Sequence, residues 1–357
     1  MLLAFLARPA RWAALLLTMI LFAAPAGAAP GPATDCFGAP RQAPDGLIRA
    51  GHRIATPGGA SLFFCEVGQP GARGVPLLLI HGGGGGSVAT FDVDVPGYSL
   101  AADLARLRRP IVLVDVRGWE GSRLPPGAQP TGPVVTAAEA VADIAAVADW
   151  LRTHERARRV ALLGFASGGH WAGLYAERYP GSVERLALLN AMYGVKAPWP
   201  LRAAFADPAD PSRFDPALGA YRIVDRDQLV VNMRRWEQLT GAKFDPRVIA
   251  DHQRIAFDHG DVGADGRLRI PNGFSKDHFG LADGIGGWDA AKVRVPILVL
   301  RSERDHWSRL EDPAAILRAA SGRSELVVLP GAGHFAMLSP SDKGRAVLVA
   351  TLMRFFG

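Results

Sequence analysis

One short turn and two later polar residues give this 357-residue chain side chains that could act on a carbonyl group. Residues 160–170 read V-A-L-L-G-F-A-S-G-G-H, in which an apolar run breaks into glycines around Ser167. Asp305 and His334 each follow a later apolar run. A nucleophile turn, an acid and a histidine in this order form the arrangement in which a carboxylate orients an imidazole as a general base. The pattern therefore predicts acid–base or nucleophilic chemistry.

A run of glycines could supply backbone donors for such chemistry. The sequence H-G-G-G-G-G-S at 81–87 directly follows an apolar run. Glycines let the backbone approach a ligand and present N–H groups to a developing oxyanion. A phosphate-binding loop is one alternative, but no Gly-Lys-Ser/Thr follows the glycines. A flexible turn is the other, and the position after a strand favours an oxyanion loop.

The hydrophobic pattern predicts the elements that position these residues. Six short, continuous apolar runs alternate with longer helical stretches and lie at residues 75–80, 110–116, 159–165, 183–190, 295–300 and 325–329. Continuous apolar runs are typical of strands covered on both faces, as in a parallel sheet. Between them, 136–154 has apolar residues at helical spacing. The alternation predicts a doubly wound α/β sheet, with earlier strands at 47–55 and 61–67 antiparallel at one edge.

A long connection at 191–292 interrupts this alternation. Its pattern indicates no buried strand, only Pro- and Asp-rich turns and helical pieces such as 227–240. Because a compact domain does not leave such a length without structure, we expect a cap or lid over the carboxyl ends of the strands. The predicted α/β core then comprises 47–190 and 293–357, after an N-terminal tail at 29–46.

The first residues predict export from the cytoplasm. Residues 1–28 carry Arg8 and Arg11 ahead of an apolar run and small residues, which is typical of a removable secretory signal. The run of roughly 13 residues is shorter than the about 20 that span a bilayer, so we expect no stable membrane insertion after removal. A secreted or periplasmic location would allow Cys36 and Cys65, the only cysteines, to form a disulfide, although two free thiols stay open as an alternative.

Composition argues against one class of partner. The chain is 49% hydrophobic and 21% charged, which is ordinary for a globular protein. Its formal net charge is +6, but no block of consecutive Lys and Arg occurs. A nucleic-acid partner therefore gains no support.

Taken together, these motifs resemble the α/β-hydrolase superfamily over residues 47–356. The resemblance rests on five features, which are H-G-G at 81–83, D-V-R-G at 115–118, the turn at 164–169, Asp305 and His334. The chain looks most similar to the capped branch of esterases, lipases and aminopeptidase-like enzymes. The resemblance implies an ester, amide or lactone-like small molecule as ligand and no cofactor. It says much less about which substrate is used.

The chain departs from this superfamily at the nucleophile. Aligned through the flanking glycines, the nucleophile position of G-x-S-x-G is Ala166, and Ser167 falls one residue later. The resemblance implies that Ser167 and Gly83 donate backbone N–H groups to an oxyanion hole. Four explanations stay open. Ala166 is an engineered Ser→Ala change; the protein is a natural binding protein that has lost catalysis; the turn slips so that Ser167 attacks; or the Asp305–His334 pair activates water or takes a substrate proton directly.

A second departure affects the superfamily's run D-x-R-G-x-G-x-S. Here residues 115–122 place Glu120 at the second glycine. A tolerated loop change is one interpretation, and a chain drifting away from catalysis is the other.

Further residues are predicted from their places near strand ends. His81, Gly82, Phe91, Trp119 and Trp307 are expected to line the substrate pocket, although packing would explain the aromatic side chains equally well.

Histidines outside these motifs do not predict a metal site. His252, His259 and His278, with nearby aspartates, fit no closed ligand set, so we expect exposed loop residues and no metal. His170 is expected on the helix after the turn, under the cap or against the sheet.

Overall fold

The computed structural model describes residues 33–42 and 44–357. Residues from Ala33 to Gly357 form one compact unit. The predicted signal at 1–28 lies outside the described residues. No helix in the described part is long and apolar enough to cross a membrane.

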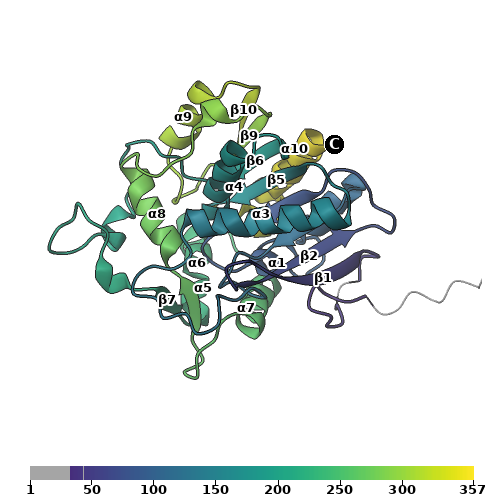
Figure 1. Ribbon diagram of the computed structural model, residues 1–357, viewed down its shortest axis with the longest axis horizontal. Helices are drawn as coiled ribbons and strands as arrows, with labels where there is room; N and C mark the ends of the chain where they lie inside the picture. The colour runs from purple at the N-terminus through teal and green to yellow at the C-terminus, as the bar shows by residue number, and fades with distance from the viewer. Residues whose placement is uncertain (1–32, 43) are drawn as a thin grey trace, which may run out of the picture. The chain divides into compact units, whose positions relative to one another are not determined.

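The core of this unit is an eight-stranded sheet in the order β1-β2-β4-β3-β5-β6-β9-β10 (Figure 1). Its strands are β1 (Ile48–Ala55), β2 (Ser61–Gly68), β3 (Leu77–Ile80), β4 (Ile111–Val114), β5 (Val160–Phe165), β6 (Val183–Leu189), β9 (Ile297–Ser302) and β10 (Ser324–Leu329). β2 pairs antiparallel with both of its neighbours, and every other pair in the sheet is parallel. The predicted doubly wound, mostly parallel sheet with an antiparallel edge is therefore confirmed.

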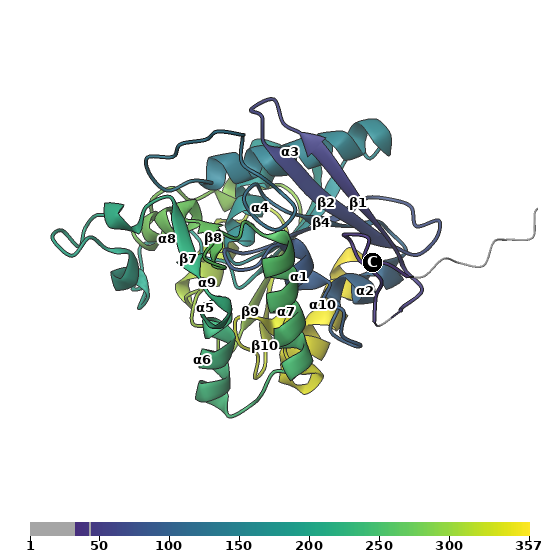
Figure 2. The same ribbon diagram turned by 90° about the horizontal axis from the view of Figure 1, so that it is seen from below.

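Helices cover both faces of this sheet, which explains the continuous apolar runs. Every residue of β3, β4 and β5 is buried. The core helices are α1 (Ser87–Phe91), α2 (Leu100–Leu104), α3 (Ala137–His154), α4 (Ser167–Arg178), α9 (Glu311–Ala319) and α10 (Ala346–Phe356). Figures 1 and 2 show α3 and α4 on one side of the sheet and α10 on the other. The predicted helix 136–154 begins one residue later, because Thr136 caps it in a capping box with Glu139.

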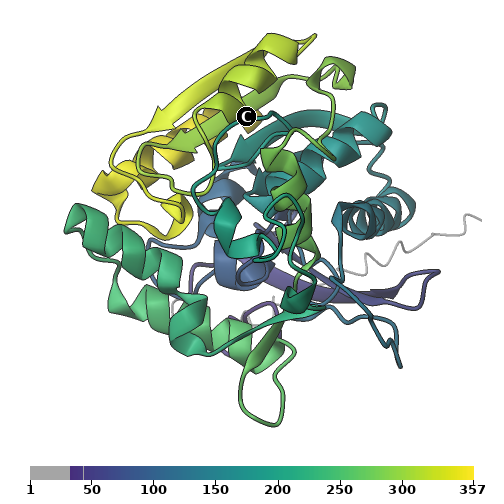
Figure 3. The ribbon, with the colours of Figure 1, turned by 90° about the vertical axis from the view of Figure 1, so that its left-hand side faces the viewer.

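The insertion between β6 and β9 contains four α-helices, three short 3-10 helices and two strands, contrary to the expectation of no buried strand. The strands and α-helices are β7 (Tyr221–Val224), α5 (Arg226–Leu229), α6 (Val231–Thr240), α7 (Pro246–His259), β8 (Leu268–Pro271) and α8 (Gly273–Ala282). β7 and β8 pair antiparallel, and Leu268 and Ile270 of β8 are buried. The pattern missed the pair because each strand is short and three helices, α5, α6 and α7, separate the partners. Figure 3 shows the insertion facing the viewer.

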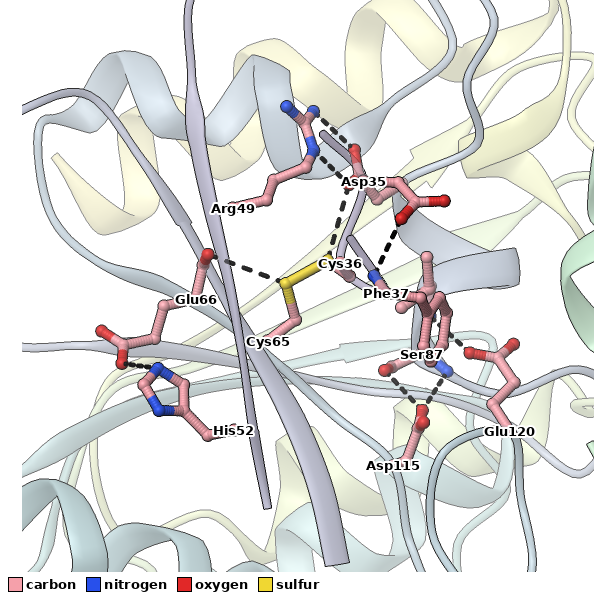
Figure 4. The surroundings of a disulfide bond; sticks show 12 residues. Asp35, Cys36, Phe37, Arg49, His52, Cys65, Glu66, Ser87, Asp115 and Glu120 are labelled. Atoms are coloured by element: carbon pink, nitrogen blue, oxygen red, sulfur yellow. Dashed lines mark hydrogen bonds and ion pairs between the residues drawn. A yellow bond between two sulfur atoms is a disulfide. The ribbon is translucent and has the colours of Figure 1, made fainter. Parts of the chain in front are cut away.

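The N-terminal tail is attached to the sheet by a disulfide. Cys36 in the tail is bonded to Cys65 in β2, and both residues are buried (Figure 4). The Asp35 carboxylate accepts hydrogen bonds from the backbone N–H groups of Phe37 and Ala39, both at 2.9 Å. The two cysteines therefore form the predicted disulfide, which joins residues separated by 29 positions in the sequence.

Candidate active site

The turn between β5 and α4 places Ala166 at its tip. Ala166 has φ 50° and ψ −115°, a backbone conformation that residues other than glycine rarely adopt. It directly precedes the first residue of α4. A Cβ atom on Gly168 would lie 2.3 Å from the carbonyl oxygen of His81, and one on Gly164 would lie 2.3 Å from that of Gly168. These two glycines are therefore needed for a tight strand-to-helix turn.

Ser167 lies one residue beyond the tip, as the first residue of α4. Its hydroxyl oxygen is buried and has no hydrogen-bond partner among the described residues. No contact links this hydroxyl to His334, whose ring bonds Asp305 instead. This geometry gives no support to a slipped turn in which Ser167 attacks.

Asp305 and His334 lie at the carboxyl ends of neighbouring strands and form a buried pair. The Nδ1 atom of His334 lies 2.8 Å from Oδ1 of Asp305. Asp305 also accepts hydrogen bonds from the N–H of Trp307 at 3.2 Å and from the N–H and hydroxyl of Ser308 at 2.8 and 2.5 Å. Burial alone would raise the pKa of Asp305, but the charge and hydrogen bond of His334 and the bonds from Ser308 together lower it.

These contacts fix the tautomer of His334. Because the ionised Asp305 can only accept, Nδ1 of His334 carries the proton and donates it. Nε2 is then the basic nitrogen, and it has no hydrogen-bond partner in the described part of the chain. The pair is thus arranged as a general base.

Asn190, at the end of β6, holds this pair in place and was missed from the sequence. Its side-chain amide donates to the carbonyl of His334 at 2.8 Å and to the hydroxyl of Ser302 at 2.9 Å, and it accepts from the N–H of Ser302 at 2.7 Å. In the sequence, Asn190 is a single polar residue at the end of the apolar run 183–190, and the prediction included it in that strand.

His81 anchors the glycine loop and does not line the pocket as predicted. Its Nε2 accepts from the N–H of Val116 at 3.1 Å, and its Nδ1 donates to the carbonyl of Gly82 at 2.7 Å. Complete burial lowers the pKa of His81 to about 4, so the ring is neutral at pH 7. Both nitrogens are used within the protein, which leaves none for a ligand.

Asp115 and Glu120 form a second buried acidic site beneath the glycine loop (Figure 4). Asp115 accepts from the N–H and hydroxyl of Ser87 at 2.8 and 2.6 Å and from the N–H of Gly121 at 3.0 Å. Glu120 accepts from the N–H groups of Val88 and Ala89 at 3.0 and 3.1 Å.

The two carboxyl groups of this site disfavour each other's ionisation. Burial raises the pKa of Asp115 to about 6, despite its hydrogen bonds. Burial and the nearby Asp115 raise the pKa of Glu120 well above its usual range. A Cβ on Gly86 would lie 2.6 Å from the Glu120 carboxyl carbon, so this acid packs directly against the loop. Glu120 is therefore more than a tolerated loop change, because its side chain holds the start of α1.

A small cavity of about 50 Å³ lies over the turn. Ala166, Ser167 and His334 line it from the core, together with Gly83 and Trp307. The insertion contributes the remaining polar side chains, which are Arg222, Gln228 and Asn232. Hollows of about 430 and 680 Å³ occur elsewhere, but neither contains Ala166 or His334.

Three more of the predicted pocket residues do not line this cavity. Gly82 lies beneath it, where a Cβ would lie 3.1 Å from that of Ala166. Phe91 is fully buried in α1 because it packs into the core. Trp119 is also buried, and its indole N–H donates to the carbonyl of Gly84 at 3.0 Å. Trp307 alone among the predicted aromatic side chains lines the cavity.

The histidines of the insertion were wrongly expected to be exposed loop residues. His252 and His278 are fully buried on α7 and α8, and their Nδ1 atoms lie 2.8 and 2.7 Å from the carbonyl oxygens of Ala89 and Phe274. His259 ends α7 and stacks on Phe37 with ring centres 3.6 Å apart. The described residues contain no cluster of metal ligands.

His170 lies on α4 and is almost completely buried. Neither ring nitrogen has a hydrogen-bond partner within the described chain, and burial lowers the pKa of His170 to about 3. The ring is therefore neutral and unable to serve as a cationic site at pH 7.

Comparison with known families agrees with this geometry. A family model described as the alpha/beta hydrolase fold matches residues 75–340. The chain belongs to the α/β-hydrolase fold family. No curated protein matched the chain by sequence.

Solved structures of this fold family superpose over most of the chain. The 2-hydroxy-6-oxo-6-phenylhexa-2,4-dienoate hydrolase from Rhodococcus sp. strain RHA1 is 17% identical with TM-score 0.57, covering 87% of this chain and 99% of its own. A serine hydrolase from the polyaromatic hydrocarbon-degrading bacterium Cycloclasticus zankles is 14% identical with TM-score 0.59, covering 87% and 98%. A thermophilic esterase from Thermogutta terrifontis is 21% identical with TM-score 0.54, covering 86% and 97%. At these identities the likeness shows the fold alone.

Proposed function

We propose that this α/β-hydrolase-fold protein binds a small ester, amide or lactone over Ala166 and hydrolyses it with His334 as a general base. The observation that carries the proposal is the intact Asp305–His334 pair, in which no serine hydroxyl of the described residues bonds Nε2 of His334. Burying an ionised carboxylate costs several kcal/mol unless it is paired, and a pocket that only binds a neutral ligand gains nothing from that cost.

The proposed reaction uses water in place of a serine. Nε2 of His334 takes a proton from a water molecule, and the hydroxide attacks the carbonyl carbon. The N–H groups of Gly83 and Ser167 stabilise the tetrahedral oxyanion. The imidazolium, held by Asp305, then returns the proton to the leaving oxygen or nitrogen as the bond to carbon breaks. Ala166 forms no bond with the substrate in this scheme.

A binding protein without turnover is the second candidate, and Ala166 is the observation that favours it. A methyl group cannot attack a carbonyl, and loss of a nucleophile removes most of the rate of a serine hydrolase. On this candidate the same cavity holds a ligand, and His334 serves as a hydrogen-bond partner to it.

Kinetics with a panel of small esters and lactones separate these candidates. General-base catalysis contributes about 10²- to 10⁴-fold, so His334→Ala should lower kcat/KM by that factor. Ser167→Ala should leave kcat/KM within about threefold, because the buried hydroxyl has no partner to lose. Equal losses in both variants would instead support attack by Ser167. Ligand binding with no His334-dependent turnover would favour the binding protein.

We also propose that the chain is exported and that residues 191–292 act as a cap. The N-terminal pattern and the Cys36–Cys65 bond support export, since disulfides persist in oxidising compartments. The mass of the protein recovered from the periplasm or medium should correspond to a chain starting near residue 29. Recovery of the full-length chain only from the cytoplasm would contradict export.

A further inference from the structure

Arg222 brings a positive charge from the insertion to the cavity over Ala166. It lies on β7 and lines the same cavity as Ala166 and His334. Its Nη2 donates to the carbonyl of Gly83 at 3.0 Å, and its guanidinium lies 5.4 Å from the ring centre of Phe274. The cation is thus held against the glycine loop, next to the proposed reaction site.

No carboxylate neutralises this guanidinium. Arg222 forms no ion pair within the described residues, and the cavity lining contains no Asp or Glu. Gln228 and Asn232, the other polar side chains from the insertion, are uncharged amides. Burial lowers the pKa of Arg222 to about 10, which still leaves it protonated at pH 7. Asp305, the buried acid that follows β9, is already paired with His334.

A purely structural role accounts for only a small part of this arrangement. The hydrogen bond to Gly83 uses one of five guanidinium N–H donors. The Nε atom is buried and has no partner in the described chain. A buried donor of a charged group left unpaired is costly, and a neutral amide could hold the Gly83 carbonyl without that cost. The unused donors therefore point to an acceptor that the described residues do not supply.

We propose that the small ester, amide or lactone bound over Ala166 carries a carboxylate that pairs with Arg222. A planar carboxylate matches the planar guanidinium through two parallel hydrogen bonds, and a single cation suits a single negative charge. This inference rests on the proposed function for the position of the reacting carbonyl, but carboxylate binding itself does not require turnover. The insertion would then select the substrate, while the α/β core supplies the chemistry.

Calorimetric titration with matched ligands tests this selection. Monomethyl succinate and methyl succinamate have the same shape and differ in bearing a carboxylate or a neutral amide, and the malonate and glutarate analogues vary the chain length. At pH 7 the wild-type chain should bind one of the carboxylates at least about tenfold more tightly than its amide, as expected for a charge-assisted pair. Equal affinities within every pair, or no carboxylate binding at millimolar concentration, would overturn the inference.

Variants separate selection by charge from support of the loop. Arg222→Met removes the charge, and Arg222→Gln removes it while keeping a donor for the Gly83 carbonyl. Both should reduce the preference to within about twofold, and the Gln variant carries the test if the Met variant does not fold. Arg267→Met is the matched control, because Arg267 is exposed beside the same two strands and is absent from the cavity lining. It should keep the wild-type preference. A preference that survives in both Arg222 variants would overturn the inference.

The same titration distinguishes failure of this inference from failure of the proposed function. If His334 does not act as a base, His334→Ala will leave turnover unchanged, yet the carboxylate preference will persist. If Arg222 does not select the ligand, the preference will be absent although His334-dependent turnover remains.

Discussion

Two buried acidic sites follow different strands of the same sheet and have opposite electrostatic properties. Asp305 follows β9 and is paired with His334, and its pKa is lowered. Asp115 follows β4 and packs with Glu120, and the pKa of each is raised. Both sites lie in the interior and both use backbone N–H donors.

Both sites are buried, so the opposite pKa shifts of Asp305 and Asp115 come from the groups that surround each carboxylate. A histidine next to Asp305 makes ionisation favourable, so that site can orient a base. At the other site the hydrogen bonds do not offset the burial of Asp115, and burial together with Asp115 disfavours ionisation of Glu120, so that site shapes the loop beside the cavity and gains no catalytic charge. The two sites also give opposite pH dependences of stability. Asp305 stabilises the fold above its unfolded pKa and this contribution is lost as pH falls, whereas Asp115 and Glu120 favour folding at low pH and lose that contribution as pH rises.

The largest expected effect comes from a change that disrupts the Asp305–His334 pair. Asp305→Asn places an amide donor where Nδ1 of His334 needs an acceptor, which favours the wrong tautomer. We expect kcat/KM to fall by about 10²- to 10⁴-fold with the melting temperature reported alongside as a control for folding. Wild-type activity in a folded Asp305→Asn chain would contradict the role given to this pair.

A change at the second site should act on stability. Glu120→Gln resembles the protonated acid, so Asp115 no longer faces a second ionising group. The wild-type free energy of unfolding should fall as pH rises from about 4 through about 6, and the variant should lose about 1–3 kcal/mol less over that range. Urea denaturation at successive pH values measures both curves. Parallel curves would show that the pKa of Glu120 is not raised in the folded chain.

The smallest expected effect comes from a change that weakens the support of Asp305 and leaves the Asp305–His334 pair in place. Ser308→Ala deletes the hydroxyl hydrogen bond to Asp305 but keeps the backbone one at 2.8 Å. Because Ser308 positions the acid and touches no substrate, kcat should fall by about tenfold while KM stays within about twofold. Steady-state kinetics separate the two parameters. A rise in KM alone would indicate that Ser308 contacts the ligand.

Most of the fold could be predicted from the sequence because the patterns that indicate strands and turns involve residues close together in the chain. Continuous apolar runs identified the strands of the parallel sheet, and Gly164 and Gly168 marked a turn that only small residues allow. Asp305 and His334 could be paired because each follows an apolar run predicted to be a strand, and parallel strands bring their carboxyl ends to one edge of the sheet.

The missed features depend on contacts between distant segments. Arg222 reaches the glycine loop from a β7–β8 ladder whose strands are separated by three helices, and no periodicity marks that pairing. His252 and His278 are buried on α7 and α8, and one nitrogen of each ring lies within hydrogen-bond distance of a single carbonyl oxygen, which composition does not reveal. Phe91 and Trp119 were assigned to the pocket from their positions near strand ends, but both pack into the core.

Intact-protein mass spectrometry during turnover of 4-nitrophenyl acetate tests the central claim most directly. If His334 activates water, the wild-type chain releases nitrophenol without an acetyl adduct, and His334→Ala loses this release. Ala166→Ser, which restores a hydroxyl at the tip of the turn, should accumulate an acetyl group at position 166. An acetyl adduct on Ser167 of the wild-type chain would contradict the account.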